Sequence, residues 1–188
     1  MDGDALAKIE EHVGVILLLL GLDPGEEGLK HTPRRVARYL AEYRQPFSTS
    51  AVLAAPFSAR GVHNMIIQHP IPFRMMCEHH LLPALGSASV GYVPRDLIVG
   101  LSKLPRLVEA VGLERPSMQE YICDRIAELL NQHIQPAGVI VVIKAEHSCM
   151  ACRGVAVPGV ITTTSSVKGI FRDVPAARQE FFSLIKGT

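Results

Sequence analysis

The sequence lacks the patterns that would place it in several broad functional classes. It holds four cysteines in 188 residues, without regular spacing, so it has no disulfide framework of the kind found in small secreted proteins. Its formal net charge is +1, and a general nucleic-acid binder would show a basic excess. We therefore expect a protein of the reducing cytoplasm that has no nucleic-acid partner.

Long apolar runs are missing as well. The run Val13–Leu22 falls far short of the roughly 20 residues that span a bilayer, and acidic residues precede it. We expect neither a membrane anchor nor a cleaved leader. The sequence shows no internal repeat, and its 48% of hydrophobic residues can build a core without disulfides.

Two short segments hold most of the side chains that could do chemistry. The first, CEHHLLP at residues 77–83, contains a thiol, a carboxylate and two imidazoles; the second, HSCMACR at residues 147–153, also clusters Cys and His. Cys77 and His80 have C-x-x-H spacing, which can bring sulfur and ring nitrogen within about 4 Å, as a tetrahedral zinc ion requires. The two segments are therefore predicted to form one zinc site.

The residues alone leave two kinds of zinc centre open. A closed structural centre would use four ligands: Cys77, His80, Cys149 and Cys152. That arrangement gives no role to His79 or His147. A catalytic zinc keeps three protein ligands and leaves one position to water, and two imidazoles beside it could transfer protons near neutral pH.

Apolar periodicity predicts an α+β protein with an antiparallel sheet. The predicted helices are 4–21, 32–40, 102–111, 117–134 and 175–185, and the predicted strands are 64–73, 85–93, 139–145 and 161–167. Residues 48–60 are predicted to be a connecting loop. Pro70 and Pro72 cannot donate to a sheet ladder, so the first strand should lie at an edge or end early.

The N-terminal segment shows signals of its own. The first helix is apolar on more than one side from Val13 to Leu20, and Gly21 is placed to stop it. A helix of this kind needs burial on several sides, which predicts a subunit interface. Thr32 is predicted to cap the second helix, with Pro33 at its first position.

Five motifs occur in an order that is specific to one enzyme family. They are CEHHLLP (77–83), GLSKLPRLVE (100–109), MQE (118–120), HSCMACRGV (147–155) and ITTTSS (161–166). In these motifs the chain resembles GTP cyclohydrolase I, from Thr32 to about Phe182. The resemblance implies a tunnelling fold with helices on one face of the sheet, in which subunit sheets join into a ring barrel and pentameric rings stack into a decamer. Residues 1–47 would be an N-terminal helical extension and residues 48–188 the catalytic domain.

The resemblance also assigns roles to individual residues. It implies that Cys77, His80 and Cys149 bind Zn²⁺, while His79 and His147 act as acid and base. It implies that guanine is recognised by a carboxylate, whose two oxygens suit the adjacent N–H groups of the base. The matching residues for the base are Glu120 and Gln119, and those for the triphosphate are Ser102, Lys103, Arg106, Arg153 and, from a neighbouring subunit, Arg35.

The reaction implied is hydrolytic opening of the five-membered ring of guanine in GTP. Formate leaves, and the product is 7,8-dihydroneopterin triphosphate, the first intermediate of folate and pterin biosynthesis. Two departures, Tyr121 where the family usually has Arg and Ser117 where it often has Gln, concern the purine pocket. Two other functions stay open: a tunnelling-fold nitrile reductase of the deazaguanine pathway, and a non-catalytic ring protein with structural zinc.

Overall fold

The computed structural model describes residues 3–186, which divide into two compact units between Gln45 and Pro46. The first unit is a pair of helices in contact, α1 (Gly3–Leu19) and α2 (Thr32–Glu42). Gly21 follows α1 with a φ of 76°, in the left-handed region where glycine ends helices at little cost. The predicted stop at this glycine is confirmed.

The second unit contains all strands of the described chain. Its elements are α3 (Thr49–Val52), β1 (Phe57–Ser58), β2 (Ile66–Met76), β3 (Pro83–Val93), β4 (Leu97–Ile98), α4 (Lys103–Glu114), α5 (Gln119–Ile134), β5 (Gly138–His147), α6 (Ser148–Ala151), β6 (Ile161–Gly169), α7 (Ile170–Asp173) and α8 (Pro175–Ile185). No helix within residues 3–186 is both long enough and apolar enough to cross a membrane.

The main sheet is antiparallel with the strand order β2-β3-β5-β6, and β1 pairs with β4. This confirms the predicted α+β class. β2 is an edge strand, as Pro70 and Pro72 predicted, and its pairing with β3 is interrupted between Gln68 and Ile71. An edge position suits these prolines because one side of the strand needs no ladder donors.

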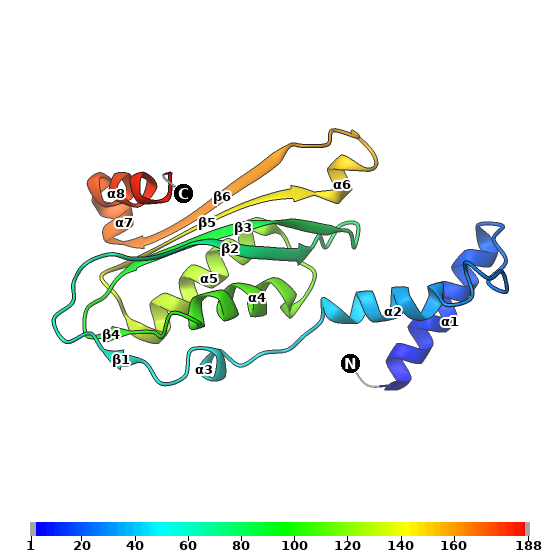
Figure 1. The fold of residues 1–188 in the computed structure, drawn as a ribbon, viewed down its shortest axis with the longest axis horizontal. Coiled ribbons are helices and arrows are strands. Elements are labelled where there is room, and N and C mark those ends of the chain that lie inside the picture. Colours follow the sequence, from blue (N-terminus) through cyan, green and yellow to red (C-terminus); the bar gives the residue numbers. More distant parts are fainter. Residues whose placement is uncertain (1–2, 187–188) are drawn as a thin grey trace. The chain divides into compact units, whose positions relative to one another are not determined.

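Helices pack on both faces of the sheet, which corrects the expectation of helices on one face (Figure 1). The strand β5, which is buried throughout residues 138–143, shows this directly, since successive side chains of a strand point to opposite faces. Val139, Val141 and Ile143 join the cluster of buried residues from α4 and α5. Ile140 and Val142 join a second cluster with Phe171 of α7 and Phe181 of α8.

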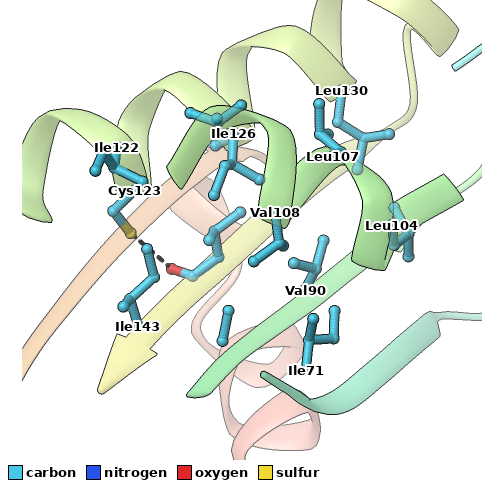
Figure 2. Close-up of a cluster of buried hydrophobic side chains, with 14 of the residues drawn as sticks. Ile71, Val90, Leu104, Leu107, Val108, Ile122, Cys123, Ile126, Leu130 and Ile143 are labelled. Carbon is cyan, nitrogen blue, oxygen red and sulfur yellow. Dashed lines mark hydrogen bonds between the residues drawn. The ribbon is translucent and has the colours of Figure 1, made fainter. Parts of the chain in front are cut away.

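The larger core lies between the sheet and the helices α4 and α5, as Figure 2 shows. Four apolar side chains of α5 are buried in this core: Ile122, Ile126, Leu129 and Leu130. Cys123 belongs to this core: its Sγ lies 3.5 Å from the carbonyl oxygen of Val141, and burial raises the pKa of its thiol to about 11. It is a packing residue rather than a reactive or metal-binding thiol.

Three of the differences between the predicted elements and the structure follow from backbone hydrogen bonds. The cap of α2 is His31, because its carbonyl accepts the first helical bond from Arg35 N–H. α5 begins at Gln119 and not at Ser117, because the Ser117 backbone pairs with the chain around residue 77. The predicted loop 48–60 contains α3 and β1, and β1 is a strand only through its distant partner β4.

Candidate metal centre and active site

The loop between β2 and β3 carries the first Cys and His cluster. Its ends close on each other, because Cys77 N–H donates to the carbonyl oxygen of Leu82 at 2.9 Å and Leu81 N–H donates to that of Cys77 at 2.9 Å. Leu81 has a φ of 52°, a left-handed conformation that leucine rarely adopts. The tight turn places the Cys77 and His80 side chains on one short segment.

The register of the sheet brings the second cluster to the same place. Ala84, near the start of β3, pairs with His147, the last residue of β5. Cys149 follows at once in α6. Two segments about 70 residues apart in sequence thus meet at one end of the sheet.

The start of α5 is attached to the same loop by backbone hydrogen bonds. Ser117 N–H donates to the carbonyl oxygen of Met76 at 3.0 Å, and Glu78 N–H donates to that of Ser117 at 3.2 Å. Gln119 and Glu120, in the first turn of α5, are therefore held beside the Cys and His loop.

Three side chains form a group that could hold a metal ion. The ligand atoms of Cys77, His80 and Cys149 all lie within 4.8 Å of one another. Burial, and then the neighbouring Cys77 thiol, raise the pKa of Cys149. Two thiolates this close need a cation between them, and two sulfurs with one imidazole nitrogen are a donor set that zinc favours. The residues therefore fit a zinc ion.

Cys152 is outside this group in the described chain. Its side chain is exposed, and its Sγ lies 2.9 Å from the carbonyl oxygen of Ser148 as a hydrogen-bond donor. A thiol that donates to a backbone carbonyl one helical turn away is not directed at the other two cysteines. This geometry favours a centre with three protein ligands over the closed alternative.

A cavity of about 320 Å³ adjoins the metal group. Its lining includes the predicted residues His79, Gln119, Glu120 and His147 together with the three candidate ligands. It also includes Met118, Met150 and Thr162, which the sequence reasoning missed. The alternation of β6 could have singled out Thr162, because Thr162 and Thr164 share one face of that strand.

The two adjacent histidines of the first cluster are arranged differently. His80 belongs to the metal group, whereas His79 does not. The rings of the pair are nearly perpendicular, at 80° with centroids 6.3 Å apart. His79 Nδ1 lies 3.9 Å from Cys77 Sγ, so His79 lies next to the metal group and lines the cavity.

His147 is half-buried and bonded to the side chain of Gln119. Its Nε2 lies 2.8 Å from Gln119 Oε1. Burial lowers the pKa of His147, and the nearby Glu120 carboxylate partly opposes this. Gln119 is only 1% exposed, so its side chain is committed to hydrogen bonds within the protein.

The predicted triphosphate residues lie elsewhere on the described chain. Ser102 caps α4, and Lys103 and Arg106 follow in its first turns; none of them lines the cavity beside the metal group. Arg106 instead lines a separate hollow with Arg74 and Glu109. Arg153 is exposed after α6, and Arg35 is exposed on α2 of the first unit.

Comparison with known proteins gives one consistent family. The model of the GTP cyclohydrolase I family matches residues 9–186. The GTP cyclohydrolase 1 proteins of Halalkalibacterium halodurans and Aquifex aeolicus are 44% and 43% identical to this chain, and that of Pelotomaculum thermopropionicum is 47% identical. In each case the match covers 96% of both proteins.

Among solved structures, the apo archaeosine synthase QueF-Like matches with a TM-score of 0.45 and 16% identity. The match covers 56% of this chain and 92% of that one.

Proposed function

Because the chain belongs to the GTP cyclohydrolase I family, we propose that it is a zinc-dependent hydrolase that opens the five-membered ring of guanine in GTP. The products are formate and 7,8-dihydroneopterin triphosphate. The observation that supports this most is the metal group of Cys77, His80 and Cys149 beside a cavity that His79 and Glu120 also line.

Zinc held by three protein ligands lowers the pKa of water to about 7 and so supplies a nucleophile at neutral pH. The side chains of the cavity supply the proton transfers. His79 donates a proton to nitrogen 7 of guanine as carbon 8 is attacked. His147 is the second acid and base, and its lowered pKa keeps the neutral, proton-accepting form populated at pH 7.

Glu120 selects the base. It lies in the first turn of α5 and lines the cavity, where its two oxygens accept parallel hydrogen bonds from the ring N–H and exocyclic amine of guanine. Backbone N–H groups at the start of the same helix are free of intrahelical acceptors and complete the recognition of the base.

The triphosphate is bound by cations that come together only in an assembly. Lys103 and Arg106 lie in the first turns of α4, with Ser102 adding a hydroxyl at its start, while Arg153 follows α6. We propose that the chain forms a tunnelling-fold ring, in which sheets join and rings stack into a decamer, so that each site takes Arg35 from a neighbouring subunit.

The first unit supports an assembled state. Near the C-terminal end of α1, large apolar side chains are exposed: Val15, Ile16, Leu18 and Leu19. Mixing Arg35→Ala chains with His79→Ala chains tests the shared site, since some sites of a mixed ring combine two intact halves. Partial recovery of activity is expected, and no recovery in rings of verified mixed composition would count against sharing.

One assay separates this function from its alternatives. Zinc is measured on the purified protein, which is then incubated with GTP while pterin fluorescence and released formate are followed. A zinc-bound ring without turnover would indicate a structural protein. A nitrile reductase would consume nicotinamide cofactor and need a nucleophilic cysteine, whereas Cys77 is 7% exposed and belongs to the metal group. We also propose that the protein is located in the reducing cytoplasm, because that compartment keeps cysteine thiols from forming disulfides.

A further inference from the structure

The side chain of Gln119 connects the two strands β5 and β6 to His147. Its Nε2 lies 3.1 Å from the carbonyl oxygen of Ile143 on β5, 3.1 Å from that of Thr162 on β6, and 3.1 Å from Thr164 Oγ1. Its Oε1 lies 2.8 Å from His147 Nε2. Both polar atoms of this buried side chain therefore have hydrogen-bond partners within the protein.

These partners fix which way the amide faces. Backbone carbonyl oxygens can only accept hydrogen bonds, so the two from Ile143 and Thr162 require the NH₂ group on their side. A flipped amide would place Oε1 against both carbonyl oxygens and leave buried acceptors without donors, which costs about 1–3 kcal/mol for each group. The oxygen Oε1 must therefore face His147.

The same reasoning sets the proton on the ring of His147. Oε1 is an acceptor, so the ring nitrogen that faces it must be a donor. We propose that Gln119 is a positioning residue that holds neutral His147 as the Nε2–H tautomer, leaving Nδ1 as its proton-accepting atom. This rests on the proposed function, since it matters to catalysis only if His147 transfers protons there.

Positioning and substrate contact predict different kinetics. A residue that orients His147 affects the chemical step, so its loss lowers kcat with little change in KM. A side chain that binds guanine raises KM as well. An imidazole misplaced by about 1 Å loses on the order of 10- to 100-fold in rate.

The test uses Gln119→Met, which keeps the length and packing of the side chain but neither donates to the carbonyls nor accepts from His147. We expect unchanged zinc content and a kcat lower by about 10- to 100-fold, with KM for GTP within about threefold of the wild type. Thr164→Val is the matched control, because it removes one of three acceptors and leaves Oε1 in place; it should lose less than about threefold. Loss of zinc in Gln119→Met, or a rise in KM that accounts for the defect, would overturn the proposal.

A double-mutant cycle asks whether Gln119 acts through His147. In a His147→Ala background, Gln119→Met should have no further effect on kcat, because the group it orients is gone. Multiplicative losses would show that Gln119 acts independently and would refute the positioning role.

The tautomer itself is measured without turnover. Solid-state ¹⁵N spectra of the zinc-loaded protein with labelled histidine are recorded at about pH 8.5, above the ordinary histidine pKa, and the His147 signals are identified by their absence in His147→Ala. We expect Nε2–H in the wild type and in Thr164→Val, and a mixture in Gln119→Met. An Nδ1–H wild type would refute the proposal even if Gln119→Met fails to fold. Failure of the wild type to convert GTP would refute the proposed function and leave this measurement standing.

Discussion

Replacing Glu120 by Gln tests base recognition with a change of one atom. The carboxylate offers two acceptors to guanine, whereas the amide offers one acceptor and one donor. One charge-assisted bond becomes a neutral bond, and the other becomes a donor facing a donor. The first change costs about 1 kcal/mol and the second about 1–3 kcal/mol, so the loss is about 2–4 kcal/mol. At 1.36 kcal/mol per tenfold, kcat/KM for GTP should fall by about 30- to 900-fold.

The same substitution has a small effect on stability that must be measured beside it. Glu120 lies in the first turn of α5, where a negative charge stabilises the helix by about 0.3–1 kcal/mol. Glu128→Gln is the matched control, because Glu128 is on the same helix but pairs with Lys168 at 3.1 Å and does not line the cavity. It should change kcat/KM less than about twofold. Steady-state assays of pterin formation with urea unfolding of both variants separate the effects, and an unchanged kcat/KM in Glu120→Gln would remove this residue from base recognition.

Three further predictions concern the metal group and the second core. His79→Ala should keep its zinc and lose ring opening, whereas His80→Ala should lose the metal; equal zinc loss in both would reverse their roles. Cys152→Ser should bind one zinc per chain and stay active, with His80→Ala as the control for metal loss, and a zinc-free Cys152→Ser protein would contradict the three-ligand centre. Phe181→Ala should lower the free energy of unfolding by about 3–5 kcal/mol, because Phe181 is fully buried. The adjacent, partly exposed Phe182 gives the control Phe182→Ala, and similar urea midpoints for the two variants would show that α8 is not held by this core.

The sequence predicted the strands well because their signals are local. Each of these signals can be recognised from residues that are close together in the sequence. Examples are the alternation along β3 and the prolines of the edge strand β2. The apolar stripe of α5 is a local signal of the same kind for a helix. The second helical layer was missed although β5 carried a sign of it. Its continuous apolar run, Val139 to Ile143, is typical of a strand that is buried on both faces. In an antiparallel sheet with one solvent-exposed face, apolar and polar residues would alternate along this strand.

The environment of Gln119 could not be predicted, because its partners lie on segments remote in sequence. Carbonyl groups from β5 and β6 accept from its amide, and backbone atoms carry no sequence signal of their own. A Gln-Glu pair at the start of an amphipathic helix gave no reason to expect one side chain almost fully buried and the next exposed. The orientation of α5 on the sheet decides that difference, because it turns Gln119 toward β5 and β6.

The register also brings together two segments that each hold a residue of the metal group and a histidine of the cavity. The turn after β2 and the end of β5 meet because Ala84 pairs with His147. The first segment carries His80 and His79, and the second carries Cys149 and His147. One strand pairing therefore aligns both histidines with the metal group. A shift of this register by one residue would turn His147 to the other face of the sheet, away from Gln119.

The metal centre and the acid–base pair are thus predicted to be lost together by any change that disturbs the pairing of β3 with β5. Gly86→Ala is such a change, since an added Cβ would lie 1.9 Å from the backbone oxygen of Lys144 on β5. It should lower zinc content and activity in parallel, and a variant that keeps full zinc while losing activity would show that the two halves of the site are aligned by something other than the sheet.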